Sequence, residues 1–290
     1  MQIIHTAAEL RAQLKSQASI GFVPTMGNLH AGHMHLVEIA KQQAQCVVVS
    51  IFVNPLQFGA NEDLAGYPRT LDADCEKLKA AGAHIVFAPS VAEMYPDFDG
   101  HNLNQSMSIT PPPIAHELCG ASRHGHFGGV ATVVMKLFSL IFFNGASRQV
   151  AVFGKKDFQQ LFIIKELVKQ FNLPVEIIAG ETMREPSGLA MSSRNGYLTP
   201  EQRATAAQLQ QGLQKIVSAI QQGNKRYSDL EQQLTQELNG KGWAVDYIST
   251  RSAVSLAPVT ANDTHLVVLA AAKLGNTRLI DNIDFFAPGS

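Results

Sequence analysis

Two histidines three residues apart open a segment that is suited to holding phosphate. His30 and His33 follow an apolar run, 19–23, and a short turn that contains Gly27. Residues three apart on a helix face the same way, so both imidazoles could contact one phosphate. Unpaired amide groups at a helix start, together with the helix dipole, favour an anion there. The segment 24–33 therefore predicts a nucleotide phosphate site at the start of a helix.

The glycines of this turn have the spacing of a P-loop, but the lysine and the hydroxyl residue that a P-loop requires are missing. Gly27 and Gly32 stand five residues apart. His33, however, takes the place of the phosphate-binding lysine, and Met34 takes that of the metal-binding hydroxyl. No G-x-G-x-x-G sequence follows the strand, so the dinucleotide fingerprint is absent as well. The alternatives are a capping role for the histidines, or a zinc site that also uses His35, although no cysteine or fourth ligand lies nearby.

Polar residues also follow two further predicted strands and the predicted domain boundary. Gln57 comes after the strand 46–53, and it can donate and accept hydrogen bonds, which suits a small substrate with hydroxyl and carboxylate groups. Lys156, after the strand 150–153, would direct a mobile positive charge at phosphates. The segment 191–194 (Met-Ser-Ser-Arg) places hydroxyl groups beside an arginine, a common way to bind anions. A polar turn, a solvated lysine and an ordinary loop are the structural alternatives.

Apolar strands alternate with amphipathic helices through the first two thirds of the chain. This order predicts an α/β fold, a Rossmann-like parallel sheet with helices on both faces. Ligands of such sheets bind beyond the carboxyl ends of the strands, where the polar residues above emerge. The predicted strands are 20–23, 46–53, 84–88, 150–153 and 175–179; the predicted helices are 33–44, 71–81, 129–143 and 157–171, the last with Asp157 and Gln160 as a capping pair.

The pattern changes near residue 186, which predicts a domain 1–185 and a smaller α+β domain 186–290 that closes over the site. Thr199 and Gln202 form a predicted capping box with Pro200 at the first helical position. Ser228 predicts a second helix start of the same kind. Short strand-like runs follow at 245–248, 265–271 and 277–280.

One long irregular segment, 101–129, interrupts the first domain. Segments of this length in a compact domain are usually lids or disordered loops. Its Arg, His and Gly residues favour a lid over an anionic ligand, with 120–128 as the covering part.

Charge, cysteine content and hydropathy limit the class of protein. The 290 residues include 23 basic and 24 acidic side chains, so there is no electrostatic footprint for nucleic acid or an anionic membrane. Three cysteines are too few for a disulfide framework. The longest apolar stretch, 130–143, is interrupted by polar residues, and the N-terminal segment lacks the features of a signal peptide. We expect a cytoplasmic globular protein.

Taken together, these motifs resemble the pantothenate synthetase family of the nucleotidylyltransferase-like superfamily. His30-Ala31-Gly32-His33 corresponds to the superfamily's HIGH signature, and the segment 191–194 resembles a degenerate KMSKS loop. The matching segments occur in family order across the whole chain: 24–33, 51–58, 67–70, 118–127, 152–161 and 188–195.

The resemblance implies a reaction in which ATP, (R)-pantoate and β-alanine give pantothenate, AMP and pyrophosphate through a pantoyl-adenylate. It implies Mg²⁺ bound with ATP, no resident metal and a homodimer. His33 would donate a proton, and His30 and Lys156 would act with it on the reacting phosphate. Gln57 and Gln160 would bind pantoate, with Gln57 also near β-alanine. The implied ATP-binding residues are Met26, Gly27, Asn28, Leu29, His30, Ala31, Gly32, His33, Gly154, Lys155, Lys156, Asp157, Met183, Met191, Ser192, Ser193 and Arg194.

Three positions depart from the family pattern: Lys155 replaces a usually acidic residue, Asn28 an alanine, and His124 a proline. Asp72 and Asp74 could contact Mg²⁺ or could simply begin a helix. The alternatives to this family are a nucleotidyltransferase that acts on a phosphorylated acceptor, and a non-catalytic ATP-binding protein.

Overall fold

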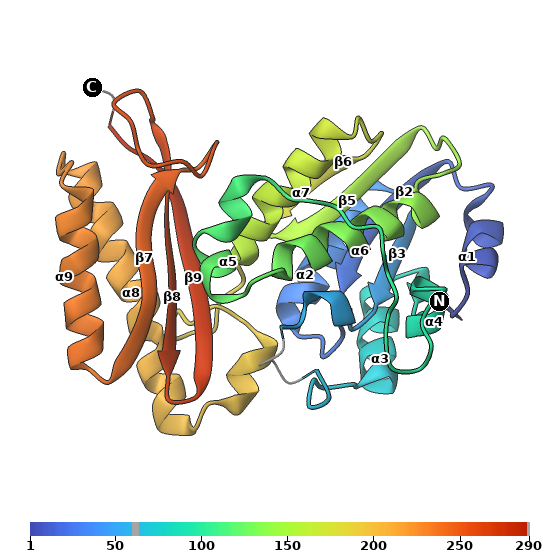
Figure 1. The fold of residues 1–290 in the computed structure, drawn as a ribbon, viewed down its shortest axis with the longest axis horizontal. Coiled ribbons are helices and arrows are strands. Elements are labelled where there is room, and N and C mark those ends of the chain that lie inside the picture. The colour runs from blue at the N-terminus through green and yellow to red at the C-terminus, as the bar shows by residue number, and fades with distance from the viewer. Residues whose placement is uncertain (60–63, 289–290) are drawn as a thin grey trace.

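Six parallel strands form the larger of two sheets, in the order β1-β4-β3-β2-β5-β6 (Figure 1). The computed structural model describes residues 1–59 and 64–288. The predicted parallel sheet is confirmed, with small shifts at the strand ends, and a short unpredicted strand, β1, adds one edge. The strands are β1 (Gln2–Ile4), β2 (Ser19–Thr25), β3 (Cys46–Ile51), β4 (Ile85–Phe87), β5 (Arg148–Gly154) and β6 (Glu176–Gly180).

Helices cover both faces of this sheet, as continuous apolar strands require. Phe22 and Val48 point to the face covered by α1, α6 and α7, whereas the adjacent Val23 and Val49 point to the face covered by α2 and α3. The helices are α1 (Ala7–Leu14), α2 (Ala31–Gln43), α3 (Leu71–Ala81), α4 (Val91–Met94), α5 (Cys119–Ser122), α6 (His126–Ile141) and α7 (Phe158–Gln170), with short 3₁₀ turns η1 (Pro55–Gln57), η2 (Pro113–His116) and η3 (Lys155–Asp157).

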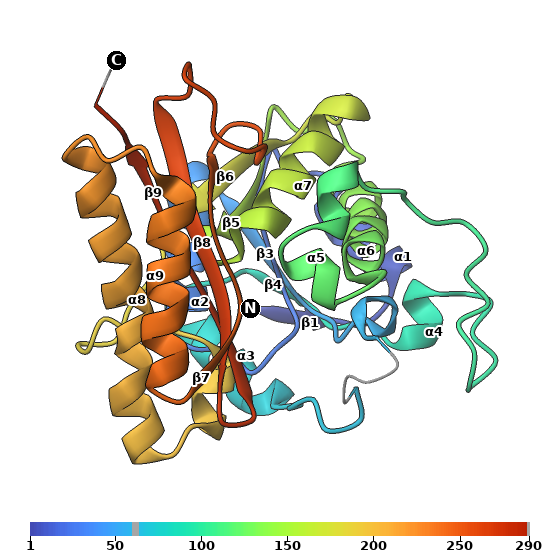
Figure 2. The same cartoon turned by 60° about the vertical axis from the view of Figure 1, so that its left-hand side comes forward.

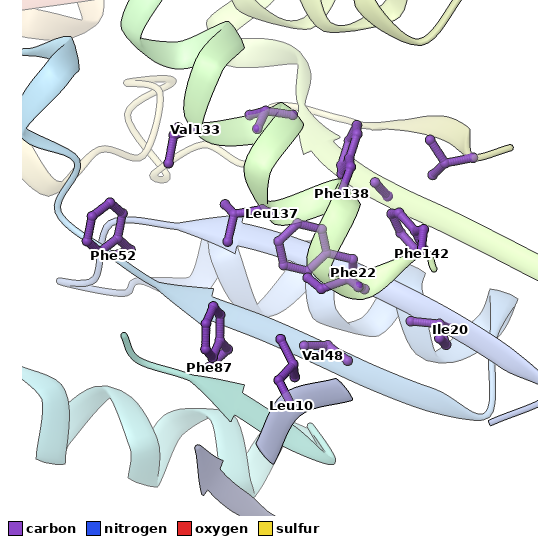
Figure 3. Packing of buried hydrophobic residues seen from close by; sticks show 14 of the residues in the cluster. Leu10, Ile20, Phe22, Val48, Phe52, Phe87, Val133, Leu137, Phe138 and Phe142 are labelled. Carbon is purple, nitrogen blue, oxygen red and sulfur yellow. The ribbon is translucent and has the colours of Figure 1, made fainter. Parts of the chain in front are cut away.

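Aromatic packing fixes α6 against the sheet. The ring of Phe22 meets Phe138 and Phe142 edge to face, with centroids 6.3 and 6.2 Å apart (Figure 3). Burying each such side chain stabilises the fold by about 1.5–3 kcal/mol. At the other end of α6, Gly129 lies against η1, where a Cβ atom would be 2.2 Å from the Leu56 carbonyl oxygen. The helix therefore fixes the position of η1.

The smaller sheet is antiparallel, in the order β7-β8-β9, and completes the predicted α+β domain. Its helices α8 and α9 cover the side that faces away from the parallel sheet (Figure 2). The Thr199–Gln202 capping box of α8 is confirmed, because each side chain accepts from the other's amide group. The elements are α8 (Pro200–Gln221), α9 (Tyr227–Gly240), β7 (Trp243–Ser252), β8 (His265–Leu274) and β9 (Thr277–Phe286).

Two sequence predictions about local structure are wrong. Ser228 does not cap α9, because the helix already begins at Tyr227, which packs against the core of the smaller domain. The segment 101–129 is not irregular throughout, because it contains η2, α5 and the start of α6, whereas the lid role predicted for 120–128 stays a prediction. Gln159 of α7 donates to the carbonyl oxygens of Ile114 and Glu117, and a Cβ atom on Gly120 would lie 1.8 Å from a neighbouring carbonyl.

The chain order creates a crevice between β2 and β5. From β2 the chain moves outward through β3 and β4, and it then returns to the opposite side of β2 as β5. Ligands of open α/β sheets bind at such a topological switch point. The turn after β2 and the turn after β5 both border it. Within the described residues, none of the helices combines the length and the apolar content that crossing a membrane requires.

Candidate active site

A cavity of about 250 Å³ opens at the carboxyl ends of β2 and β5. Tyr67, Asn54 and Glu181, none of them predicted as site residues, also line it. The predicted Asn28, Leu29, Ala31 and Lys155 lie outside its lining. The predicted residues that line it are Met26, Gly27, His30, Gly32, His33, Gln57, Gly154, Lys156, Asp157, Gln160, Met183, Met191, Ser192, Ser193 and Arg194.

The turn before α2 is held by hydrogen bonds within the protein. Gly27 and Asn28 both adopt left-handed backbone conformations, with φ of 83° and 51°, which glycine and asparagine tolerate best. The amide groups of Asn28 and Leu29 each donate to the buried carboxylate of Asp74 at 2.8 Å. These two amides of the turn are therefore held by a side chain of α3, whereas the expectation of anion-binding amides concerns the first residues of α2 and stays a prediction.

The two histidines cap α2 through their Nδ1 atoms. His30 Nδ1 accepts from the Gly32 amide at 3.1 Å, and His33 Nδ1 accepts from the His30 amide at 3.2 Å. A neutral imidazole whose Nδ1 accepts a hydrogen bond carries its proton on Nε2. Each ring therefore keeps an Nε2–H donor, and the ring centroids are 4.1 Å apart on the cavity wall. Capping and phosphate binding, considered above as alternatives, are compatible in this geometry.

Both imidazoles are neutral near pH 7. Burial, followed by the charges of Lys156 and Lys77, lowers the pKa of His30 to about 4. Burial, followed by the charges of His30 and Lys156, lowers the pKa of His33 to about 3. The histidines are therefore neutral hydrogen-bond donors on this wall. The positive charges on the cavity wall come from Lys156 and Arg194.

The turn after β5 holds Lys156 at the cavity. Its Nζ lies 3.2 Å from the carboxylate of Asp157, so that side chain does not form the predicted capping pair with Gln160. Burial acts to raise the pKa of Asp157, but the charge and the hydrogen bond of Lys156, together with the charge of Arg194 and a smaller contribution from His126, outweigh burial, and the net shift is downward. From β9, Asn282 donates to the carbonyl oxygens of both Lys155 and Lys156 at 2.9 Å. Hydrogen bonds from the smaller domain thus stabilise the backbone of this turn.

Lys155 lies outside the cavity lining and joins the end of β6 to β9. Its Nζ lies 2.6 Å from Glu181, after β6, and 3.2 Å from Asp284 in β9. Burial opposes its charge, but these two carboxylates raise its pKa. An acidic residue at this position would face these two carboxylates.

A buried network fixes the Gln57 carboxamide. The Asn54 side chain, only 1% exposed, donates to Gln57 Oε1 at 3.2 Å and to the Gly129 carbonyl at 3.1 Å. The Tyr95 hydroxyl, also buried, donates to Asn54 Oδ1 at 2.6 Å. Because its oxygen is held, Gln57 presents its amide nitrogen to the cavity beside Met26. Sequence reasoning missed Tyr95, which lies far along the chain and carries no local signal.

An apolar surface lies between the polar groups. Val130, Val133 and Val134 of α6 line the cavity together with Phe52 and Phe153 from the strand ends. These side chains exclude water from one wall while the carboxamides and charges occupy the others.

The loop that carries residues 191–194 is anchored to the smaller domain. Arg184 forms a bidentate ion pair with Asp281 of β9, at 2.7 and 2.9 Å. Ser192 accepts from the amide group of Arg194, which shapes the loop at its tip. Tyr67 is hydrogen-bonded to Ser193, and burial raises the pKa of the Tyr67 hydroxyl. The segment therefore reaches the cavity from the domain boundary, as the sequence predicted.

Across residues 1–59 and 64–288, no three His, Cys, Asp or Glu side chains are grouped to hold a metal ion, so the zinc alternative finds no support. Asp74 is committed to the turn before α2, and Asp72 is exposed outside the cavity lining. His124 is likewise exposed, between α5 and α6.

Comparison with known proteins gives one consistent family. Residues 2–284 match the model of the family described as pantoate-beta-alanine ligase. A pantothenate synthetase of Methylobacillus flagellatus is 63% identical over 98% of this chain and 99% of its own length, and one of Thiobacillus denitrificans is 55% identical over 98% and 97%. The crystal structure of the Thermus thermophilus enzyme superposes with a TM-score of 0.88 at 40% identity, covering 98% of this chain and 99% of the other. A Francisella tularensis pantoate-beta-alanine ligase, complexed with beta-gamma ATP and beta-alanine, gives a TM-score of 0.78 at 34% identity, covering 98% and 97%.

Proposed function

Because this chain belongs to the pantoate–β-alanine ligase family, we propose that the cavity between β2 and β5 is where it condenses (R)-pantoate with β-alanine at the expense of ATP. The resemblance inferred from the motifs is confirmed, and the nucleotidyltransferase alternative is not favoured. The observation that carries the site assignment is the convergence of two Nε2–H donors, two cations and two carboxamides on one cavity at the switch point.

In this assignment the ATP phosphates lie against the start of α2 and the turn after β5. His30 and His33 donate from Nε2, while Lys156 and Arg194 supply positive charge. Ser192 and Ser193 add hydroxyl donors from the anchored loop. Fixed donors and cations of this kind stabilise phosphoryl oxygens because they need no reorganisation during the reaction.

Pantoate lies deeper, against α6. Gln57 donates to a pantoate oxygen from the amide nitrogen that it presents to the cavity, and the Gln160 carboxamide binds a second polar group of pantoate, because a carboxamide can both donate and accept. The two methyl groups of pantoate contact the valine surface of α6, where Val130, Val133 and Val134 have no polar atoms to leave unpaired.

The first step joins two anions, and the protein provides positioning and positive potential. A carboxylate oxygen of pantoate attacks the α-phosphorus of ATP, and the bond from that phosphorus to the bridging oxygen breaks to release pyrophosphate. No proton is gained or lost at the reacting atoms. Lys156 and the Nε2–H groups of His30 and His33 hold the oxygens on which charge increases, so His33 acts as a hydrogen-bond donor rather than as a charged acid.

In the second step the amine of β-alanine attacks the acyl carbon of the adenylate, and the bond to the AMP oxygen breaks. The amine must lose a proton. Neither His30 nor His33 can accept it in the neutral form, because each Nδ1 is occupied and each Nε2 already carries hydrogen. We assign this proton to the phosphate of the leaving AMP.

We further propose that Mg²⁺ enters with ATP and is held mainly by phosphate oxygens and water, a common mode for this ion. The carboxylates on the cavity wall, Asp157 and Glu181, support this assignment, because each is already paired with a lysine. Bound there, the ion would offset phosphate charge.

The domain boundary, the oligomeric state and the location are also proposals. We place the boundary at 185/186, with the second domain closing over the site. Two observations support this boundary: the chain leaves the parallel sheet after Gly180, and Arg184 pairs with Asp281 of β9. The family resemblance supports a homodimer, which light scattering would test. Three free cysteines support the cytoplasm, where thiols stay reduced.

Product analysis with ATP, Mg²⁺ and (R)-pantoate, with and without β-alanine, tests the proposed function. We expect pyrophosphate on addition of pantoate, and sustained AMP and pantothenate formation only with β-alanine. Lys156→Ala should lower turnover by about 10²–10³-fold, whereas Lys165→Ala, an exposed lysine on α7, is the matched control. Folded protein that consumes no ATP in response to pantoate would overturn the proposal. Transfer of AMP to a phosphorylated acceptor instead would identify a nucleotidyltransferase.

A further inference from the structure

We propose that Asp74 is a positioning residue for the adenylation step, and that it orients His30 and His33 by fixing the turn that precedes them. The inference rests on the proposed function of the cavity. Asp74 itself does not line the cavity. It acts from the first turn of α3, where an acidic residue would ordinarily serve only to stabilise the helix N-terminus.

The carboxylate of Asp74 joins the start of its own helix to the turn before α2. Its carboxylate is fully buried and accepts from the amides of Asn28 and Leu29, both at 2.8 Å. The Thr70 hydroxyl donates to it at 3.0 Å, and Lys77 Nζ lies 3.5 Å away. A carboxylate without such partners would be strongly disfavoured at full burial. The surrounding donors thus stabilise the charge of Asp74, and this charge in turn fixes the amide groups of Asn28 and Leu29.

The turn needs an anchor because its backbone is unusual. Gly27 and Asn28 are both left-handed, which costs free energy at the non-glycine position. Lys77, one helical turn after Asp74, donates to the Leu29 carbonyl at 2.7 Å. The two side chains of α3 therefore hold both sides of Leu29, one through its amide and one through its carbonyl.

The histidines begin directly after this anchored residue. His30 follows Leu29, and its amide donates to Nδ1 of His33, while its own Nδ1 accepts from the Gly32 amide. The direction of both rings therefore depends on the backbone at residues 28–30. A shift of the turn would move both Nε2–H groups together and would also disturb the hydrogen bonds that fix their tautomers. Positions held this closely matter because small misplacements of catalytic donors cost large factors in rate.

Asp74→Asn is the decisive variant, because it keeps the shape and leaves one acceptor for two amide donors. We expect kcat for pantoate-dependent pyrophosphate release to fall about 10- to 100-fold, the range for one hydrogen bond to a charged group. The KM for pantoate, bound by Gln57 and Gln160, should stay within about twofold. Glu76→Gln is the matched control, an exposed carboxylate on the same helix, and should behave as wild type.

A direct readout separates positioning from a merely structural role. Imidazole ¹H–¹⁵N spectra of the wild type should show both rings protonated at Nε2, and Asp74→Asn should show mixed or exchanging tautomers. If Asp74→Asn does not fold, Thr70→Val removes one donor to the same carboxylate and should lower kcat several-fold with the tautomers partly released. Folded Asp74→Asn with wild-type kcat and unchanged spectra would overturn the proposal, as would an equal loss in kcat and in pantoate binding. If the wild type makes no pantothenate, the function fails, and the spectra still test the positioning.

Discussion

Replacing His33 tests whether the two nitrogens of its ring have separate roles, one in capping α2 and one in the cavity. Nδ1 accepts from the His30 amide at 3.2 Å and caps α2, whereas Nε2–H faces the cavity. His33→Asn places an oxygen close to the position of Nδ1 and nothing at Nε2, so it keeps the cap and removes the donor. His33→Ala removes both. The two variants should therefore differ in stability and agree in rate.

The expected magnitudes follow from these contacts. Losing a helix cap lowers the free energy of unfolding by about 0.5–2 kcal/mol. Losing one preorganised donor to a developing negative charge raises the activation barrier by about 2.7–4 kcal/mol, or about 10²–10³-fold in rate. His33→Asn should show only the kinetic loss, and His33→Ala should show the kinetic loss together with the loss of stability.

Rapid-mixing measurement of pyrophosphate release would give the rate of the first step, and urea unfolding would give the stability of each variant. Substrates should be saturating so that the comparison reports the chemical step rather than binding. If His33→Asn retained a rate near that of the wild type, the Nε2–H group would have no role in adenylation. If it were as unstable as His33→Ala, the capping function assigned to Nδ1 would be wrong.

Three further predictions concern binding, charge and pH. Gln57→Ala should raise the KM for pantoate far more than the KM for ATP in steady-state assays, and equal increases would remove Gln57 from the pantoate site. Lys155→Met should lower the free energy of unfolding by about 1 kcal/mol in urea titrations, because partly exposed ion pairs contribute little. The same variant should change the KM for ATP less than about threefold. A larger change in that KM would place Lys155 in the nucleotide site. The folded-state pKa of His33, about 3, lies below its unfolded value of 6.5, so between these pH values the unfolded state binds more protons and stability falls as pH falls. The free energy of unfolding of the wild type, taken relative to that of His33→Asn, should therefore fall when urea unfolding is repeated from pH 7 to pH 5. A difference that stays constant with pH would contradict the lowered pKa.

The sheet and the location of the site could be predicted because they depend on local pattern. Strands that are apolar on both faces, separated by amphipathic helices, imply a covered parallel sheet. Once that sheet is accepted, Gln57 and Lys156 must emerge at its carboxyl edge, since each lies in the turn that follows a strand. The family assignment came from motifs spread along the chain and not from this argument.

The contacts that orient the site could not be predicted, because they join residues far apart in sequence. Asp74 stands in a helix start where an acidic residue is ordinary, and nothing in its neighbourhood indicates that it binds amides at residues 28 and 29. Tyr95 reaches Asn54 only because the fold brings α4 beside η1. The charge state of the histidines also escaped prediction, since it depends on burial and on neighbouring lysines.

The hydrogen bonds from Asn282 to the carbonyl oxygens of Lys155 and Lys156 affect the order in which the enzyme folds during synthesis. Chains are synthesised from the N-terminus, and their domains generally fold in that order. The parallel sheet can assemble once β6 has emerged, yet the peptide groups around Lys156 gain these hydrogen bonds only after β9 has been made. The ion pair of Arg184 also forms only after β9 has been made, because its partner is Asp281 of that strand. A nascent chain would thus pass through a stage in which the parallel sheet is folded but the turn at Lys156 lacks its contacts with β9. That turn would reach its final form only after the last strand has docked.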